Sequence, residues 1–88
     1  MSISLFLNSI RSEETKKLYD FCLRQYGYDR LKLLDPKQIE QQIIDFIIKQ
    51  KQEGKSYSAI SNYIAAVKAY YQINDVLLNV KKIDRFMP

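Results

Sequence analysis

The sequence contains no histidine and no tryptophan, one cysteine, two glycines and two prolines. Without histidine, and with Cys22 as the lone thiol, neither a nucleophile beside an imidazole base nor a zinc site of Cys and His ligands can be assembled. The carboxylates are scattered, and no glycine-rich phosphate loop is present. These absences predict a chain that is not itself an enzyme and that has no cofactor and no metal.

Two further absences concern location. A single cysteine cannot form an intramolecular disulfide, which fits a reducing, intracellular setting. No apolar run approaches the roughly 20 residues that span a bilayer, and the apolar residues 3–7 are too few for the core of a signal peptide. We therefore expect a soluble cytoplasmic protein, associated with the nucleoid if it binds DNA, and no membrane partner.

The length of 88 residues, with 47% hydrophobic residues, predicts one small domain over residues 1–88 with a modest core. The net charge is +4, and its distribution is uneven. Residues 1–34 carry six basic and four acidic side chains, residues 35–54 three and four, and residues 55–88 five and two. The basic excess therefore lies in the first and last parts of the chain.

Hydrophobic periodicity predicts an all-α fold, a compact bundle of four main helices with a short extra helical turn in residues 2–10. No period-2 stretch is long enough to be a strand. The expected helices open at Ser12, at Asp35-Pro36, at Ser56 or Ser58, and at Asn79, and Gly27 and Gly54 stop the first two. The third is expected to end near Asn74.

Apolar spacing also indicates which side chains are buried. The isoleucine-rich helix after Pro36 is apolar over about half of its circumference, so we expect it to be the central, most buried helix. Leu18 is placed on the apolar face of the helix after Ser12, and the connector leucines are expected to tuck inward: Leu31, Leu33 and Leu34. Most of the seven tyrosines have core spacing, which argues against a tyrosine nucleophile.

The helix expected from Ser56 to Asn74 separates two kinds of side chain. Its inward flank is apolar and aromatic: Ile60, Tyr63, Ile64, Val67, Tyr70 and Tyr71. Its other flank is small and polar: Ser58, Ser61, Asn62, Ala65, Lys68, Ala69 and Gln72. No acidic residue occurs between Glu53 and Asp75, and a flank without carboxylates suits a polyanion. The alternative is an ordinary solvated helix face.

Nucleic-acid binding is the chemistry that the pattern favours. Lys16 and Lys17 at the start of one helix, with Lys55 and Lys68 on another, can neutralise phosphates. Ser58, Ser61 and Asn62 can then face base edges or sugars. A solvated lysine face on a helical bundle remains the alternative to this interpretation.

The order of motifs resembles that of a known family. Thr15-x-x-x-Tyr19-x-x-x-Leu23-x-x-Tyr26 is followed by an isoleucine-rich helix, then by Lys55-Ser56-x-x-Ala59-Ile60 and Ile64-x-x-Val67-Lys68-x-Tyr70-Tyr71. Over about residues 12–86 this is similar to the N-terminal core-binding domain of tyrosine recombinases of the phage-integrase type. The closing Leu78-Asn79-Val80-Lys81-Lys82-Ile83 resembles archaeal members. Ala59 departs from the pattern, because many members have threonine there.

The resemblance implies a SAM-like four-helix domain that forms half of a clamp around duplex DNA, opposite the catalytic domain, in DNA integration and recombination. It implies DNA contacts from two segments, at Lys16 and Lys17 and at Lys55, Ser56, Tyr57, Ser58, Ser61 and Asn62. The strand-cleaving residues of that family lie in a catalytic domain that this chain lacks. The implied partners are double-stranded DNA and the protein's own catalytic domain, and an oligomer on the DNA is left open.

A second function of another class fits the same helices. A helical protein-interaction module could dock a partner helix on its wide isoleucine face, or on Phe21, which lies on the polar side of its helix. Such a module would be indifferent to duplex DNA.

Overall fold

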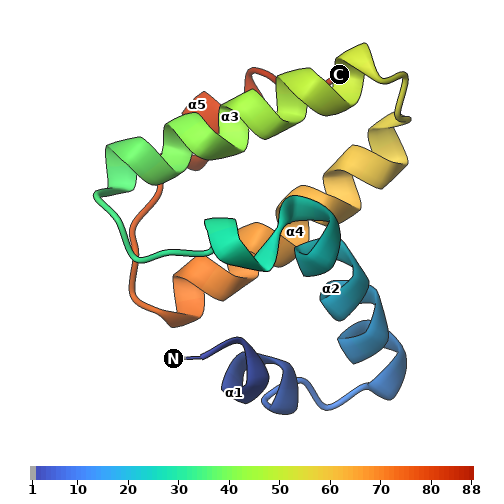
Figure 1. Cartoon of the computed structure of the whole chain (residues 1–88), viewed down its shortest axis with the longest axis vertical. Helices are drawn as coiled ribbons and strands as arrows, with labels where there is room; N and C mark the ends of the chain where they lie inside the picture. The colour runs from blue at the N-terminus through green and yellow to red at the C-terminus, as the bar shows by residue number, and fades with distance from the viewer. Residues whose placement is uncertain (1) are drawn as a thin grey trace.

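The computed structural model describes residues 2–88 (Figure 1). Its α-helices are α1 (Ile3–Asn8), α2 (Glu13–Tyr26), α3 (Pro36–Gln52), α4 (Tyr57–Ile73) and α5 (Val80–Asp84), with a 3₁₀ turn at Tyr28–Arg30. No strand occurs in this described part of the chain. The predicted all-α bundle of four main helices after a short N-terminal helix is therefore confirmed.

The expected helix boundaries have visible chemical causes. One side chain at each start accepts a hydrogen bond from a backbone N–H of the first turn: Ser12 for α2, Asp35 for α3, Ser56 for α4 and Asn79 for α5. Ser56, and not Ser58, is thus the cap of α4. Gly27 and Gly54 follow α2 and α3 with φ of 106° and 80°, a backbone conformation that glycine adopts without strain.

Helix α4 lies at the centre of the bundle and packs against α1, α2 and α3. All six of its predicted inward residues are buried. Aromatic rings join the elements, because Phe6 of α1 lies 5.6 Å from Tyr70 and the ring of Phe46 in α3 lies 6.0 Å from Tyr63. The expectation that α3 would be the central helix was therefore wrong. Its apolar stripe is buried as predicted except at Ile48, which is 37% exposed.

Three leucines are more exposed than the sequence analysis expected. Leu18 is 43% exposed, Leu33 62% and Leu34 38%, and only Leu31 of the connector is buried. The hydroxyl of Tyr71 lies 3.3 Å from the carbonyl oxygen of Arg30 and 3.2 Å from that of Lys32. Since the backbone on both sides of Leu31 is drawn to this core tyrosine, only that leucine reaches the interior.

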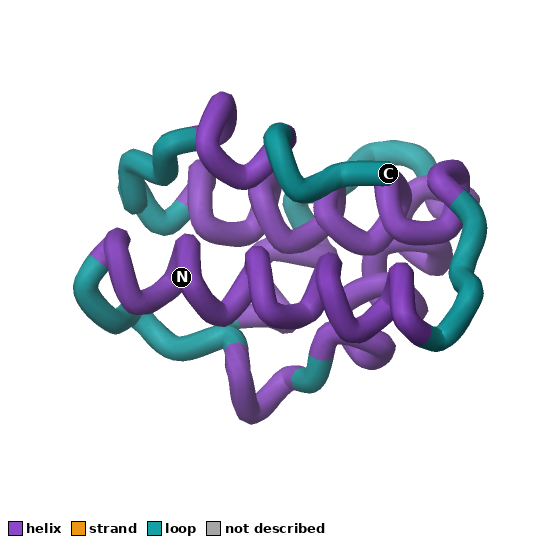
Figure 2. The backbone as a smooth tube through the Cα atoms, turned by 90° about the horizontal axis from the view of Figure 1, so that it is seen from above, coloured by secondary structure: helices purple, strands orange, loops and turns teal. Residues whose placement is uncertain are grey.

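The C-terminal segment of the chain lies beside the two longest helices, α3 and α4. Helix α5 contacts α3, and the end of the chain, marked C in Figure 2, runs beside a long helix of the bundle. Ile83 is fully buried in this contact, and the ammonium of Lys51 in α3 donates to the carbonyl of Phe86 at 2.9 Å. Within residues 2–88, no helix combines the length and the apolar character that crossing a bilayer requires.

Candidate nucleic-acid interface

Most of the predicted outer flank of α4 lies outside the core, although Ala69 packs partly against it. Ser58, Asn62, Ala65 and Gln72 are exposed, and Ser61, Lys68 and Ala69 are half-buried. The helix itself contains no carboxylate, because all 17 of its residues are apolar, neutral polar or, at Lys68, basic. Of the exposed side chains, Ser58 and Ala65 are small, so they leave the helix backbone near them accessible.

The start of α4 combines a charge, a cap and an exposed ring. The side chain of Lys55 is exposed and makes no ion pair with any of the described residues. The Oγ of Ser56 accepts the N–H of Ala59 at 3.2 Å, so this oxygen already serves the helix, although its hydroxyl can still donate. Tyr57 is 59% exposed, unlike the tyrosines deeper in α4.

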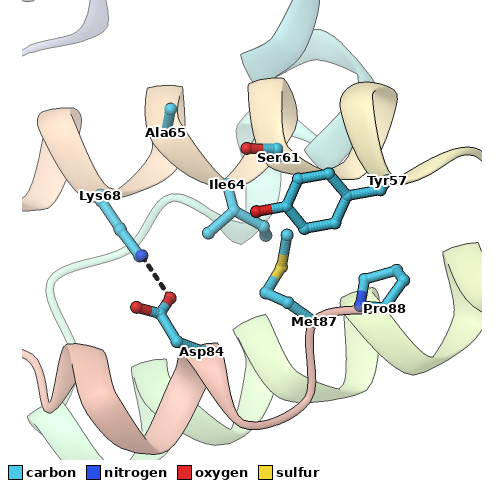
Figure 3. A pocket seen from close by; sticks show the side chains of 8 residues that line it. All are labelled: Tyr57, Ser61, Ile64, Ala65, Lys68, Asp84, Met87 and Pro88. Carbon is cyan, nitrogen blue, oxygen red and sulfur yellow. Dashed lines mark hydrogen bonds and ion pairs between the residues drawn. The ribbon is translucent and has the colours of Figure 1, made fainter.

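A hollow of about 470 Å³ lies between α4 and the C-terminal segment (Figure 3). Its walls come from both sides: Tyr57, Ser61, Ile64, Ala65, Lys68, Asp84, Met87 and Pro88. The structure thus brings three of the predicted site residues together in one hollow, namely Tyr57, Ser61 and Lys68. Met87 and Pro88 occupy the opposite wall in Figure 3, so part of the α4 flank faces this segment and not open solvent.

The charge of Lys68 is partly neutralised, which corrects the prediction that this flank lies free of carboxylates. Its ammonium lies 2.8 Å from a carboxylate oxygen of Asp84 in α5, with side-chain exposures of 26% and 53% (Figure 3). The absence of acidic residues between Glu53 and Asp75 holds for the sequence of α4, but not for the residues around α4 in space. Asp84 enters from another element, and an exposed pair of this kind stabilises the fold by only about 0–1 kcal/mol.

The two lysines of α2 are placed elsewhere. Lys16 lines a separate hollow between α1 and α2 and pairs with Glu13 at 3.2 Å. Lys17 is exposed and has no ion-pair partner in the part of the chain that the structure describes. Lys16 therefore does not share the hollow that holds Tyr57, Ser61 and Lys68, and its charge is partly neutralised by its neighbour.

A polar cluster at the end of α2 braces the fold. The hydroxyl of Tyr28 donates to the carboxylate of Asp20, Arg24 donates to the same carboxylate at 3.2 Å, and the guanidinium lies 5.1 Å from the centre of the Tyr28 ring. The Tyr28 hydrogen bond, followed by Arg24, lowers the pKa of Asp20. This carboxylate therefore stays ionised and holds the 3₁₀ turn against α2.

The reactive side chains of the chain lie mainly in the interior. Cys22 is fully buried, and burial raises the pKa of its thiol, which disfavours the nucleophilic thiolate. Tyr26, Tyr63, Tyr70 and Tyr71 are buried, in agreement with the prediction that most tyrosines are core residues. Among residues 2–88, no group of three or more His, Cys, Asp or Glu side chains is arranged to hold a metal ion.

One basic cluster on α5 was not among the site residues predicted from the sequence. Lys81, Lys82 and Arg85, with Asn79, line a hollow of about 350 Å³ on α5. The signal was present in the charge count, because residues 55–88 have the largest basic excess. The sequence could not show that α5 packs on the bundle with these side chains facing outward.

No family model matches the chain, and comparisons with curated proteins and with solved structures give no significant match.

Proposed function

We propose that this chain is a duplex-DNA-binding module of the kind found in tyrosine recombinases, with binding and not catalysis as its role. The observation that carries the proposal is α4, a central helix with no carboxylate of its own and a small, polar flank turned outward. Lys55 at its start is exposed, and hydroxyl and amide side chains follow it. Such a surface can contact phosphates first and sugars or base edges second.

The contacts are proposed on two surfaces. On α4 they involve Lys55, Ser58, Ser61, Asn62 and, once it exchanges Asp84 for a phosphate, Lys68. On α2 they involve Lys17, with Lys16 in a lesser role because of Glu13. In a longer protein, a catalytic domain would close the other side of the duplex.

Of the two surfaces predicted for a protein-interaction role, the isoleucine face of α3 and Phe21, only Phe21 remains as a candidate. The isoleucine face of α3 is buried within the bundle apart from Ile48, so it is already covered by the chain's own helices. Phe21 is 51% exposed and its ring lies 6.3 Å from that of Tyr63. With Leu18 three residues earlier, it forms a small apolar patch on α2 that favours this second candidate. Sizing the protein with and without duplex DNA separates the two roles.

The direct test compares two double variants that remove the same charge. Lys55→Gln with Lys68→Gln removes the proposed contacts, and glutamine avoids placing a second carboxylate beside Asp84. Lys37→Gln with Lys49→Gln is the control, because both lysines are exposed and have no ion-pair partner among the described residues. Each lost phosphate contact lowers the slope of log affinity against log salt by about 0.9.

We expect the Lys55 and Lys68 variant to lose about 0.9 of slope from Lys55 and up to about 0.9 more from Lys68, according to how far a phosphate displaces Asp84, and the control to lose much less. Thermal unfolding of both variants checks that they are folded. Equal losses in the two variants would show that the protein responds only to net charge, and the proposed α4 surface would then be wrong.

A further inference from the structure

On the short helix α5, the basic side chains and the single carboxylate lie on different sides. Lys81 and Arg85 are four residues apart and so lie on one side of the helix, where both are exposed. Lys82 is 44% exposed at its side chain and lies beside them. Asp84, the only carboxylate of α5, is turned to α4, where it pairs with Lys68. The outer edge of α5 is therefore purely cationic.

These cations are held on a fixed element. The backbone N–H of Asn79 donates to the buried carboxylate of Glu40 at 2.8 Å, and the side chain of Asn79 caps α5 through the N–H of Lys82 at 3.1 Å. Ile83 is fully buried. Because α5 is attached at its start and along its length, the basic side chains project from a defined backbone and not from a free tail.

The positive charge on this edge is poorly compensated. Lys82 is 3.5 Å from Glu40, and neither Lys81 nor Arg85 has an ion-pair partner within residues 2–88. Like charges at this spacing repel each other, and a bound anion removes that repulsion. The hollow between them is lined by Asn79, Lys81, Lys82 and Arg85 alone, all of which can donate hydrogen bonds to phosphate oxygens.

We propose that the outer edge of α5, centred on Lys81 and Arg85, is a third surface that binds the phosphate backbone of duplex DNA. This inference rests on the proposed function and extends it to residues outside the α4 and α2 contacts. The ion pair between Lys68 and Asp84 links α5 to α4, the helix that carries the first proposed surface.

The test uses the whole chain, a short DNA duplex and titrations at about 50 and 200 mM salt. The double variant Lys81→Gln with Arg85→Gln removes the two central positive charges of the α5 edge. The double variant Lys37→Gln with Lys49→Gln is the matched control. Loss of two phosphate contacts lowers the ratio of the two affinities about tenfold. We expect that decrease in the Lys81 and Arg85 variant and a much smaller one in the control.

The outcomes separate this inference from the proposed function. If the wild-type chain binds duplex DNA and the Lys81 and Arg85 variant behaves like the control, the inference is overturned while the α4 surface stands. If this variant loses binding but the Lys55 and Lys68 variant does not, the edge is supported and the α4 surface is wrong. If the wild-type chain binds no duplex at about 50 mM salt, both proposals are overturned.

Discussion

Tyr26 and Tyr71 are both almost completely buried, but their hydroxyl groups are in different situations. The hydroxyl of Tyr71 reaches the carbonyls of Arg30 and Lys32, whereas that of Tyr26 has no hydrogen-bond partner among the described residues. A buried polar group without a partner costs free energy, while a satisfied one contributes about 0.5–1.5 kcal/mol. The two residues should therefore respond oppositely to loss of the oxygen.

We predict that Tyr26→Phe leaves the free energy of unfolding unchanged or raises it by about 1 kcal/mol, because it removes an unpaired hydroxyl. Tyr71→Phe should lower it by about 1 kcal/mol, because two carbonyls lose their donor. Urea unfolding followed by circular dichroism measures both. A Tyr26→Phe variant as unstable as Tyr71→Phe would mean that the Tyr26 hydroxyl has a partner in solution.

Alkaline pH should weaken the fold through Tyr71. Burial raises its pKa to about 12, whereas an unfolded tyrosine ionises near about 10. The unfolded chain therefore loses this proton first as the pH rises. The contribution of Tyr71 is complete below about pH 10 and declines up to about pH 12. Urea midpoints between these values should fall less steeply in Tyr71→Phe than in the wild type, and equal slopes would contradict this.

Single residues that act locally could be predicted from the sequence, and those that depend on neighbours could not. Ser12 and Asn79 were predicted as caps because a cap bonds to its own helix. Leu18, Leu33 and Leu34 were wrongly expected to be buried, because their burial depends on which other elements cover them and not on their own segment.

At the level of elements, α5 depends on a small number of attachments. It has five residues, too few for a helix to persist alone in water. Glu40 supplies one attachment through the Asn79 N–H, and the Lys51 ammonium supplies another through the Phe86 carbonyl. Loss of either should release α5 before the rest of the bundle unfolds.

Glu40→Ala should free α5 locally, because the Asn79 N–H loses its acceptor at a cost of about 1–3 kcal/mol. We expect amide hydrogen exchange at Ile83 and Phe86 to accelerate about tenfold or more. Glu40→Gln keeps an acceptor and loses only the attraction to Lys82, so it should show a smaller effect. Unchanged exchange in Glu40→Ala would show that Glu40 does not hold this element.

Asp84 links α5 to α4 and should limit the affinity for a polyanion. We predict that Asp84→Asn frees Lys68 to neutralise a phosphate and raises the slope of log affinity against log salt by up to about 0.9, according to how far the ion pair prevents this contact in the wild type. Asp75→Asn is the control, because it removes the same charge and Asn tolerates the positive φ of 61° at that position. Equal slopes in the two variants would show that Asp84 does not keep Lys68 from the DNA.

The inward and outward flanks of α4 were predictable because they follow from helical periodicity within one element. The pairing of Lys68 with Asp84 was not, because the two residues are 16 positions apart and meet only when α5 docks. The same reason explains why Lys16 and Lys68, grouped by charge in the sequence, line different hollows.

At the scale of the whole molecule, the radius of gyration of 12.4 Å is close to the roughly 12 Å expected for a folded chain of this length. On this small body, Lys55, Lys81 and Arg85 are exposed cations without a carboxylate partner among the described residues, whereas Lys16 and Lys68 are paired. The net charge of +4 alone would give weak, unlocalised attraction. Localised binding therefore requires several of these exposed cations to contact one duplex.

The most direct measurement is the affinity of the wild-type chain for a short DNA duplex as a function of salt. We predict dissociation constants of about 10⁻⁴ to 10⁻⁶ M near physiological salt, with a slope of log affinity against log salt that corresponds to about 0.9 for each phosphate neutralised. A slope equal to two or more contacts supports phosphate binding by this domain. No detectable binding at low salt, or an affinity that salt does not change, would contradict the account.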